Sequence, residues 1–315
     1  MNSKDKTKLG EFMSNKNNMP LNVLTELMLN RGGTNAILPF IKTDKSAPNV
    51  RSIYNIPYTS DSENPFLQFD WHCPASVAEI VYKAKAPTVF YIHGGAWSSA
   101  DKKIYSRLSK DFAEQGFVVI NMNFRLMPEY DLHTHYQDCI ACIKYCLNKN
   151  DLFGIDRKRV FFAGDSSGAH MASLIGARIN DNKISINCKI AGLLLFYGIY
   201  DLNHLETVHF RICNKLHNGF KNAFGERLKR FYRDYSPTTY LSRHFPPCFI
   251  TAGEVDGLHT ESIMLSNLLD EYKVQHSTLI FPKNRKDGRH AFVNLMNNAR
   301  AEALNQMFEF MREKI

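Results

Sequence analysis

The chain has 315 residues, of which 44% are hydrophobic and 22% charged, as is usual for a soluble globular protein with a sizeable core. It contains no apolar run near the roughly 20 residues that a membrane-spanning helix needs, so no membrane association is expected. Its formal net charge of +8 is spread over short basic clusters without a recognisable nucleic-acid-binding motif, so no nucleic-acid partner is expected either.

The N-terminus and the cysteines predict a cellular location. The first residues are polar and lack the apolar core of a signal peptide. The seven cysteines are an odd number, which without an export signal indicates free thiols in a reducing compartment. We therefore expect a cytoplasmic protein. Cys139, Cys142 and Cys146 share one face of a predicted helix with apolar residues, which favours small core side chains over a metal site.

Taken in chain order, residues 1–50 are predicted to form an N-terminal extension with a short helix over 21–30, where apolar residues have helical spacing. Extended patterns over 53–56 and 66–69 predict two strands of a hairpin or meander. Further along, apolar strands alternate with helices. The predicted strands cover 87–93, 117–123, 160–163, 190–197, 247–252 and 277–281, and the predicted helices cover 103–115, 136–148, 169–179, 260–272 and a C-terminal segment around Leu304.

This alternation predicts an α/β domain over residues 51–315. Continuous apolar strands separated by helices indicate a mostly parallel sheet with helices on both faces. Such sheets place ligands at the carboxyl ends of their strands. The alternation is interrupted over about 203–245, which is predicted to be a helical insertion and a candidate lid. This insertion holds His204, His209 and His217, but their spacing matches no metal-ligand motif.

The run Gly-Asp-Ser-Ser-Gly over 164–168 lies between a predicted strand and a predicted helix. A serine in this setting can occupy the sharp turn called a nucleophile elbow, where glycines two residues before and after it relieve crowding. Ser166 would then present its hydroxyl at the carboxyl edge of the sheet and at the positive end of a helix dipole. As a bare pattern the motif also occurs in ordinary glycine-rich turns, so its context has to decide.

A serine hydroxyl is a poor nucleophile at neutral pH, so Ser166 needs a histidine to accept its proton and an acid to orient that histidine. His290 lies in the loop after the last predicted strand, and Asp256 follows the strand before it. The carboxyl ends of parallel strands meet at one edge of a sheet, so these three residues are predicted to converge. They are the candidate catalytic residues.

Other residues compete for these roles. Glu254 is an alternative orienting acid. His259 is close to Asp256 in sequence but is expected to begin the next helix, and His170 is expected on the helix after the elbow, against the sheet. Asp165, inside the elbow, is expected to make local hydrogen bonds.

Two adjacent glycines follow the predicted strand over 87–93, in the run His-Gly-Gly-Ala-Trp over 93–97. Glycines let the backbone approach a substrate closely and aim amide N–H groups at it. An oxyanion hole must be built in advance, because charge develops on the carbonyl oxygen only in the transition state. The N–H groups of Gly94, Gly95 and Ser167 are the predicted donors.

With these motifs assembled, the chain resembles the α/β-hydrolase superfamily, and within it the group of hormone-sensitive-lipase-like carboxylesterases, bacterial acetylesterases and kynurenine formamidases. The serine, acid, histidine chain order is the order of that superfamily. The resemblance covers roughly residue 65 to the C-terminus. It rests on the runs over 93–97, 123–129 and 164–168, on Asp138, Ser236-Pro237 and Pro246-Pro247, and on Asp256 and His290.

The resemblance implies a serine carboxylesterase that hydrolyses small esters with short, acetyl-type acyl chains through an acyl-enzyme on Ser166. An arylformamidase that cleaves an N-formylkynurenine-type amide is the alternative, and a non-catalytic small-molecule binding protein on the same fold is a more remote one. No metal or organic cofactor is implied. The expected partner is a small ester, and a homodimer stays open. Trp97, Tyr197 and Tyr200 are candidate substrate-binding residues.

Overall fold

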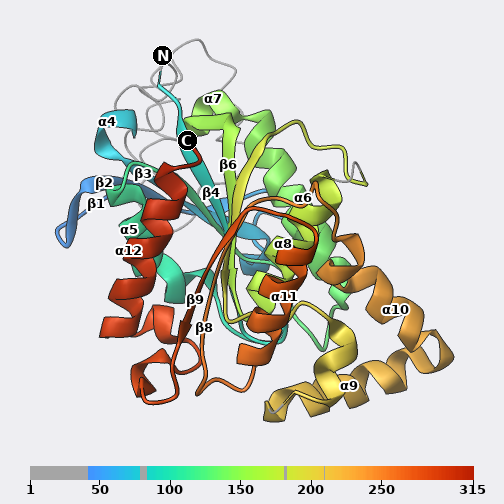
Figure 1. The fold of residues 1–315 in the computed structure, drawn as a ribbon. Coiled ribbons are helices and arrows are strands. Elements are labelled where there is room, and N and C mark those ends of the chain that lie inside the picture. The colour runs from blue at the N-terminus through green and yellow to red at the C-terminus, as the bar shows by residue number, and fades with distance from the viewer. Residues whose placement is uncertain (1–41, 79–83, 181–182, 209) are drawn as a thin grey trace.

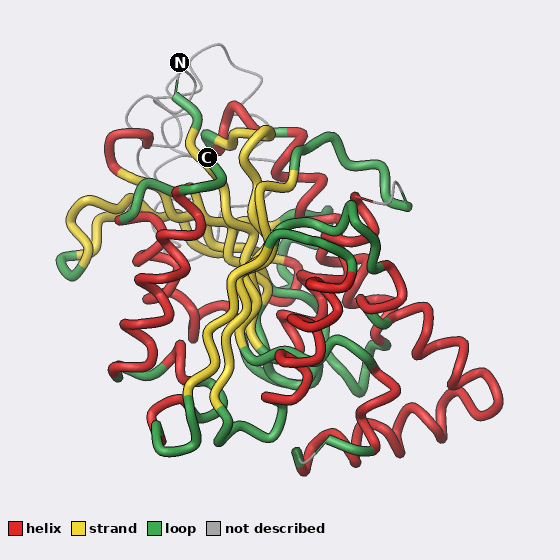
Figure 2. The backbone as a smooth tube through the Cα atoms, viewed as in Figure 1, coloured by secondary structure: helices red, strands yellow, loops and turns green. Residues whose placement is uncertain are grey.

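The computed structural model describes residues 42–78, 84–180, 183–208 and 210–315. Within them, one twisted sheet runs through the molecule and helices cover both of its faces (Figures 1 and 2). The strand order is β1-β2-β3-β5-β4-β6-β7-β8-β9. The strands are β1 (Lys42–Asp44), β2 (Ala47–Pro57), β3 (Gln68–Pro74), β4 (Ala86–Ile92), β5 (Val118–Met122), β6 (Ile155–Asp165), β7 (Ile190–Phe196), β8 (Cys248–Gly253) and β9 (His276–Phe281).

The sheet has an antiparallel and a parallel part. β2 pairs antiparallel with β1 and β3, and β3 pairs antiparallel with β5. From β5 through β4, β6, β7 and β8 to β9, every neighbouring pair is parallel. The mostly parallel sheet that the alternation predicted is therefore confirmed. The carboxyl ends of its parallel strands share one edge, and the loops that follow β4, β6, β8 and β9 all leave from that edge.

Two layers of helices enclose this sheet (Figure 1). α5 and α12 pack on one face, and α6, α8 and α11 pack on the other. Successive residues of β4 alternate between the two cores, because side chains of a strand point to opposite faces in turn: Phe90 joins the core under α8, and Val89 the core under α12. The helices are α4 (Ala75–Ala78), α5 (Ser106–Glu114), α6 (Leu132–Asn148), α7 (Asn150–Phe153), α8 (Ser167–Asn180), α11 (His259–Glu271) and α12 (Asn298–Arg312).

Other predictions made from the sequence can be set beside this fold. The three cysteines of α6, Cys139, Cys142 and Cys146, are fully buried in the core, as their spacing predicted. The predicted domain boundary at residue 51 falls inside β2, so the sheet already begins with β1. The helix predicted over 21–30 lies outside the described residues. In the part of the chain that the structure describes, no helix is both long enough and apolar enough to span a bilayer.

The interruption predicted between β7 and β8 is helical. It consists of η4 (Leu202–Glu206), α9 (Arg211–Phe224), η5 (Gly225–Arg227), α10 (Leu228–Tyr235) and η6 (Pro237–Tyr240), and these residues from 202 to 240 are called the cap below. Figure 1 shows α9 and α10 projecting away from the sheet. An aromatic cluster joins the two helices, in which the rings of Phe224 and Phe231 stack with centroids 3.9 Å apart.

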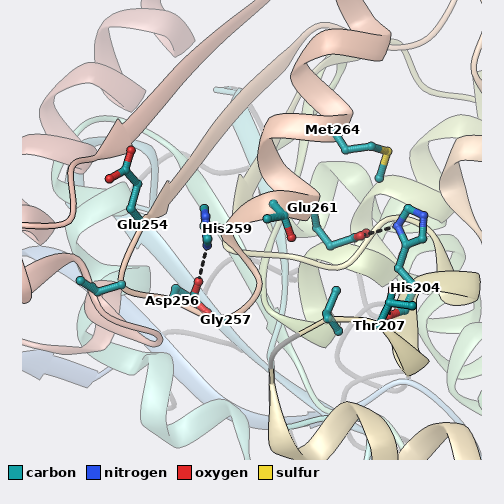
Figure 3. Close-up of a pocket in the computed structure, with 11 residues that line it drawn as sticks. His204, Thr207, Glu254, Asp256, Gly257, His259, Glu261 and Met264 are labelled. Atoms are coloured by element: carbon teal, nitrogen blue, oxygen red, sulfur yellow. Dashed lines mark hydrogen bonds and ion pairs between the residues drawn. The ribbon is translucent and has the colours of Figure 1, made fainter.

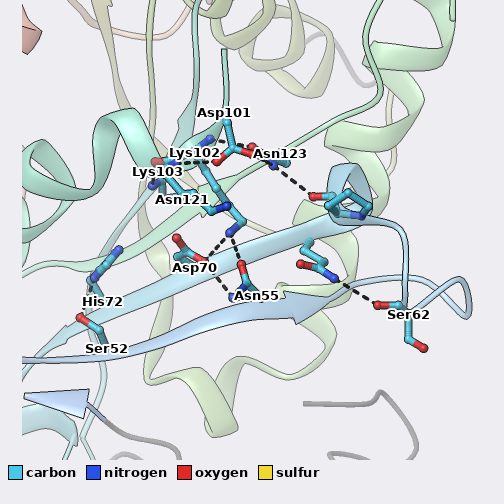
Figure 4. Close-up of polar contacts among 12 residues, drawn as sticks. Ser52, Asn55, Ser62, Asp70, His72, Asp101, Lys102, Lys103, Asn121 and Asn123 are labelled. Carbon is cyan, nitrogen blue, oxygen red and sulfur yellow. Dashed lines mark hydrogen bonds and ion pairs between the residues drawn. The ribbon is translucent and has the colours of Figure 1, made fainter. Parts of the chain in front are cut away.

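A buried polar cluster fixes the segment that follows β4 (Figure 4). Lys102 in η3 (Lys102–Tyr105) forms an ion pair of 2.7 Å with Asp70 of β3, and both side chains are 1% exposed. The Lys102 ammonium also donates to Asn55 of β2, and its backbone N–H donates to Asn123 after β5. A buried charge is tolerated only when it is paired and hydrogen-bonded. The cluster therefore holds the end of the loop over 93–101 against three strands.

Candidate active site

Ser166 sits at the sharp turn between β6 and α8, with a positive φ of 51°. The flanking glycines are required by close backbone contact. A Cβ on Gly164 would lie 2.4 Å from the carbonyl carbon of Gly168, and one on Gly168 would lie 2.1 Å from the carbonyl oxygen of Ile92. No side chain fits at such distances, so this turn has the construction of a nucleophile elbow.

The three predicted catalytic residues meet at this edge of the sheet. The Nε2 atom of His290 lies 3.1 Å from Ser166 Oγ, and its Nδ1 atom lies 2.7 Å from Asp256 Oδ2. Asp256 Oδ1 accepts a second hydrogen bond from the N–H of Leu258. The Asp256 side chain is fully buried, whereas that of His290 is 24% exposed. A buried carboxylate accepts from Nδ1–H, which leaves the Nε2 lone pair directed at the serine hydroxyl.

The competing residues lie elsewhere. Glu254 accepts a hydrogen bond from the N–H of Lys283. His259 begins α11 and bonds through Nδ1 to the backbone carbonyl of Asp256, not to its carboxylate. His170 is buried on α8 and bonds through Nε2 to the carbonyl of Tyr235 in the cap. Asp256 and His290 are therefore the acid and the histidine that the structure places beside Ser166.

The backbone amides near Ser166 differ from the prediction at one position. The N–H of Gly94 donates to Asp165 Oδ1 at 2.8 Å, so it is already used inside the protein. The N–H groups of Gly95, Ala96 and Ser167 donate to no acceptor among the described residues. Ala96 and Gly95 also line the pocket beside Ser166, and Gly94 does not. The free donors are thus Gly95, Ser167 and Ala96 in place of Gly94.

Asp165 explains why Gly94 is unavailable. Its carboxyl group is buried and accepts hydrogen bonds from the Gly94 N–H, from Tyr105 at 3.0 Å and from Tyr91 at 3.2 Å. Burial raises the pKa of Asp165 from 3.8 to about 6, and these donors oppose that rise only in part. The local hydrogen bonding expected of Asp165 is present, and it ties the elbow to the loop after β4. A second hydrogen bond between the same two segments is donated by the Trp97 N–H to Ser167 Oγ.

Ser166 opens into a pocket of about 930 Å³. The catalytic edge of the sheet forms one wall, and the start of the cap forms another. Apolar side chains dominate the remaining lining. The lining residues are Gly95, Ala96, Ser99, Ala100, Ile104, Tyr105, Asp165, Ser166, Phe210, Ile212, Val255, Asp256, Gly257, Arg289, His290, Ala291 and Asn294.

Comparison with known proteins gives the family and the fold of this chain. The family model described as BD-FAE matches residues 78–271. The chain belongs to the BD-FAE family. This is an α/β-hydrolase family, as the resemblance of the sequence motifs implied.

Solved structures of esterases share the fold. Esterase B from Lactobacillus Rhamnosis has a TM-score of 0.73 and 19% identity, over 93% of each chain. A truncated carbohydrate esterase from gut microbiota has a TM-score of 0.69 and 20% identity, over 87% of this chain and 99% of its own. A bacterial heroin esterase has a TM-score of 0.65 and 19% identity, over 93% of each chain. At these identities the likeness establishes the α/β-hydrolase fold.

In this BD-FAE protein the three aromatic residues predicted to bind substrate are packed inside and do not line the pocket. Trp97 packs edge-on against His170 and the cap residue Phe220. Tyr197 lies beneath His290, with ring centroids 4.9 Å apart, and therefore supports the imidazole. Tyr200 is fully buried between β7 and the cap. The prediction departs from the structure because Trp97, in the loop after β4, and Tyr197 and Tyr200, after β7, all have their rings buried in the core.

A second cavity, of about 570 Å³ (Figure 3), shares the lining residues Val255, Asp256 and Gly257 with the pocket beside Ser166. It is lined by Glu254, His259 and the pair His204 and Glu261, whose Nδ1 and Oε1 atoms are 2.6 Å apart. This hydrogen bond raises the pKa of His204. Glu261 also accepts from the backbone N–H of Tyr200, so it anchors the start of the cap.

The cap histidines form no metal centre in the described ranges. His204 is paired with Glu261, and His217 bonds through Nδ1 to the hydroxyl of Tyr232. His209 lies outside the described residues. No group of three or more His, Cys, Asp or Glu side chains in the described part of the chain is arranged to hold a metal ion.

Several pocket residues were missed by the sequence reasoning. Phe210 packs on His290 with ring centroids 4.6 Å apart, although the two are far apart in the chain, so no local pattern could have indicated it. Asn294 and Ile104 likewise reach the pocket only through the fold. Arg289 is different, because it adjoins His290 in sequence, and that adjacency was a usable signal.

Proposed function

We propose that this protein is a serine carboxylesterase that hydrolyses small esters with short, acetyl-type acyl chains through an acyl-enzyme on Ser166. The observation that carries the proposal is the continuous hydrogen-bond chain from Asp256 through His290 to Ser166 Oγ, which opens into an apolar pocket. Three similar structures are those of esterases, which supports the same reaction class.

The geometry suggests how each group acts. His290 Nε2 accepts the Ser166 proton while the hydroxyl oxygen attacks the ester carbonyl. Asp256 stays ionised, holds the imidazole in the required tautomer and stabilises the imidazolium. His290 then protonates the leaving alcohol, and water attacks the acyl-enzyme by the same route to release the acid.

Negative charge on the carbonyl oxygen needs donors that are already in place. The N–H groups of Gly95, Ala96 and Ser167 are proposed to supply them, since they have no acceptor in the described chain. Ser167 begins α8, so the helix dipole adds to the positive potential at this point. Asp165 is proposed to act as a positioning residue, because it fixes Gly94, which directly precedes the donors Gly95 and Ala96 in the chain.

The test is the hydrolysis of chromogenic esters from acetyl to decanoyl, with N-formylkynurenine alongside, by the wild type and Ser166→Ala. We expect turnover to be fastest on acetyl or butyryl esters and to fall at least about a thousandfold in Ser166→Ala. A maximum on the formamide would replace the proposal with an arylformamidase. Equal rates for the folded wild type and Ser166→Ala on every substrate would leave a binding protein as the better account.

A further inference from the structure

One charged side chain of the active-site pocket is unaccounted for by the proposed mechanism. The carboxyl group of Asp165 is bound to Gly94, and that of Asp256 is bound to His290. Arg289 also lines the pocket, and its side chain makes no ion pair or hydrogen bond with any described residue. It is therefore a cation at the pocket without a partner in the described chain.

The backbone of Arg289 is held on both sides. Gly288 packs so closely under Phe281 that an added Cβ would lie 2.8 Å from the Phe281 Cβ. On the other side, His290 is fixed by its hydrogen bond to Asp256, and the carbonyl of Arg289 accepts from the N–H of Phe292 at 3.1 Å. The base of the side chain therefore has a defined position relative to Ser166.

The other cations of this loop are arranged differently. Arg285 donates to Asp287 and to Glu302, so its charge is balanced within the protein. Lys283 and Lys286 are exposed and do not line the pocket. In the loop over 283–289, Arg289 is thus the cation that lines the pocket and is left to interact with a ligand.

We propose that Arg289 binds an anionic group of the substrate, so that the preferred esters carry a carboxylate at one end and an apolar portion near the ester carbonyl. This inference rests on the proposed esterase function. A guanidinium suits a carboxylate because it can donate two parallel hydrogen bonds to it. The apolar portion would lie against Ile104, Phe210 and Ile212, which line the same pocket.

The size of the effect follows from the exposure of the side chain. Arg289 is exposed to solvent, so water and salt screen its interaction with an anion. We expect it to raise kcat/KM for an anionic ester by about fivefold over the neutral ester of the same shape. Added salt at about 0.5 M should reduce this preference.

The test compares matched substrates whose carboxylate lies on either side of the ester. On the acyl side, the pair is the mono-4-nitrophenyl ester of adipic acid, whose second carboxyl group is either free or converted to a methyl ester. On the alcohol side, the pair is 4-acetoxybenzoate and 4-acetoxybenzamide. For each pair, the ratio of kcat/KM for the anionic ester to that for the neutral ester is measured in wild type, Arg289→Gln and Lys286→Gln.

Each protein is tested with the same two esters. Comparing the ratio between proteins therefore removes the difference in intrinsic reactivity between those esters. We expect one of the two ratios to fall about fivefold in Arg289→Gln and to keep its wild-type value in Lys286→Gln, and the pair that responds identifies the side that carries the carboxylate. Ratios that are equal in wild type and Arg289→Gln for both pairs overturn the inference, even where hydrolysis depends on Ser166.

A binding measurement separates this inference from the proposed function. Calorimetry on Ser166→Ala, with and without Arg289→Gln, would give the affinities for 4-phenylbutyrate and 4-phenylbutyramide without any turnover. A preference for the carboxylate that disappears with Arg289→Gln supports the anion site even where no ester is hydrolysed. Equal affinities for the two compounds in Ser166→Ala refute it.

Discussion

The two walls of the pocket around Ser166 are built in different ways. The elbow wall consists of β4, β6 and the start of α8, which touch through backbone atoms and have no room for a side chain at Gly164 or Gly168. The cap wall consists of Phe210 and the first turn of α9, which brings Ile212 to the pocket. The outer side of α9 is open, and a Cβ added at Gly219 would meet nothing within 4 Å.

This difference separates the proposed chemistry from the choice of substrate. The atoms proposed to react are fixed by the sheet, where a small displacement changes their geometry for every substrate. The cap reaches the pocket through the side chains of Phe210 and Ile212 and supplies none of the atoms proposed to react. We therefore expect changes in the elbow wall to alter the rate on all esters, and changes in the cap wall to alter which esters are preferred.

The largest contrast is expected between two glycine substitutions. In Gly168→Ala the new Cβ would lie 2.1 Å from the Ile92 carbonyl oxygen, so the backbone has to move. We expect a loss of at least about 3 kcal/mol in the free energy of unfolding and at least about a hundredfold in kcat/KM.

The matched control is Gly219→Ala in α9. Alanine has the higher helix propensity, and its Cβ has free space here, so we expect a gain of about 0.5–1 kcal/mol and little change in rate. Urea denaturation and ester hydrolysis measure both effects. Similar stability and rate in the two variants would show that the elbow is not sterically closed.

A smaller, pH-dependent change in the free energy of unfolding is expected from the titration of Asp165. Burial raises its pKa to about 6 in the folded protein from 3.8, so at pH 5 the folded state holds a proton that the unfolded chain releases. The folded state therefore gains stability from the protonated Asp165 carboxyl group. This stabilisation is fully present below pH 3.8 and is lost as the pH rises through about 6. In Asp165→Asn this titration is absent.

The stability of Asp165→Asn relative to wild type should therefore rise by about 3 kcal/mol between about pH 3.5 and 7. Urea denaturation of both proteins across this range measures the difference. A difference that stays flat with pH would contradict the burial argument. The ester hydrolysis rate of the variant, taken at one pH, reports separately on how well the amides after Gly94 are positioned.

The sequence predicted the sheet and the convergence of Ser166, Asp256 and His290 because both follow from order along the chain. Parallel strands bring their carboxyl ends to one edge, whatever the details of packing. The glycines of the elbow could be predicted for the same reason, since the turn between β6 and α8 restricts them locally.

What the sequence did not predict depends on contacts between distant segments. Gly94 was expected to be a free donor, but Asp165 accepts its N–H from a different strand end. Tyr197 was expected to line the pocket, but its ring lies under His290, which is placed by the loop after β9. Neither contact leaves a periodic pattern along the chain, so the fold is needed to find it.

The smallest change in stability is expected at the contacts between α8 and the cap. Arg178 of α8 lies over the rings of Tyr136 and Tyr240, with its guanidinium carbon 4.7 and 5.0 Å from their centroids. It also donates to the carbonyl of Asp234 at the end of α10 and to the Tyr240 hydroxyl. Its removal should lower the local free energy of opening of α10 by about 1–2 kcal/mol.

Hydrogen exchange of the α10 amides in Arg178→Ala measures this change, and the α8 amides provide an internal reference. Arg227→Ala is the matched control, because Arg227 is exposed in η5 and contributes no attachment to α8. We expect faster exchange in α10 only for Arg178→Ala, together with a higher KM and a nearly constant kcat on short esters. Equal exchange in the two variants would mean that the aromatic packing of the cap, and not Arg178, holds it in place. A fall in kcat alone would mean that the cap also positions His290, because Phe210 packs directly on its ring.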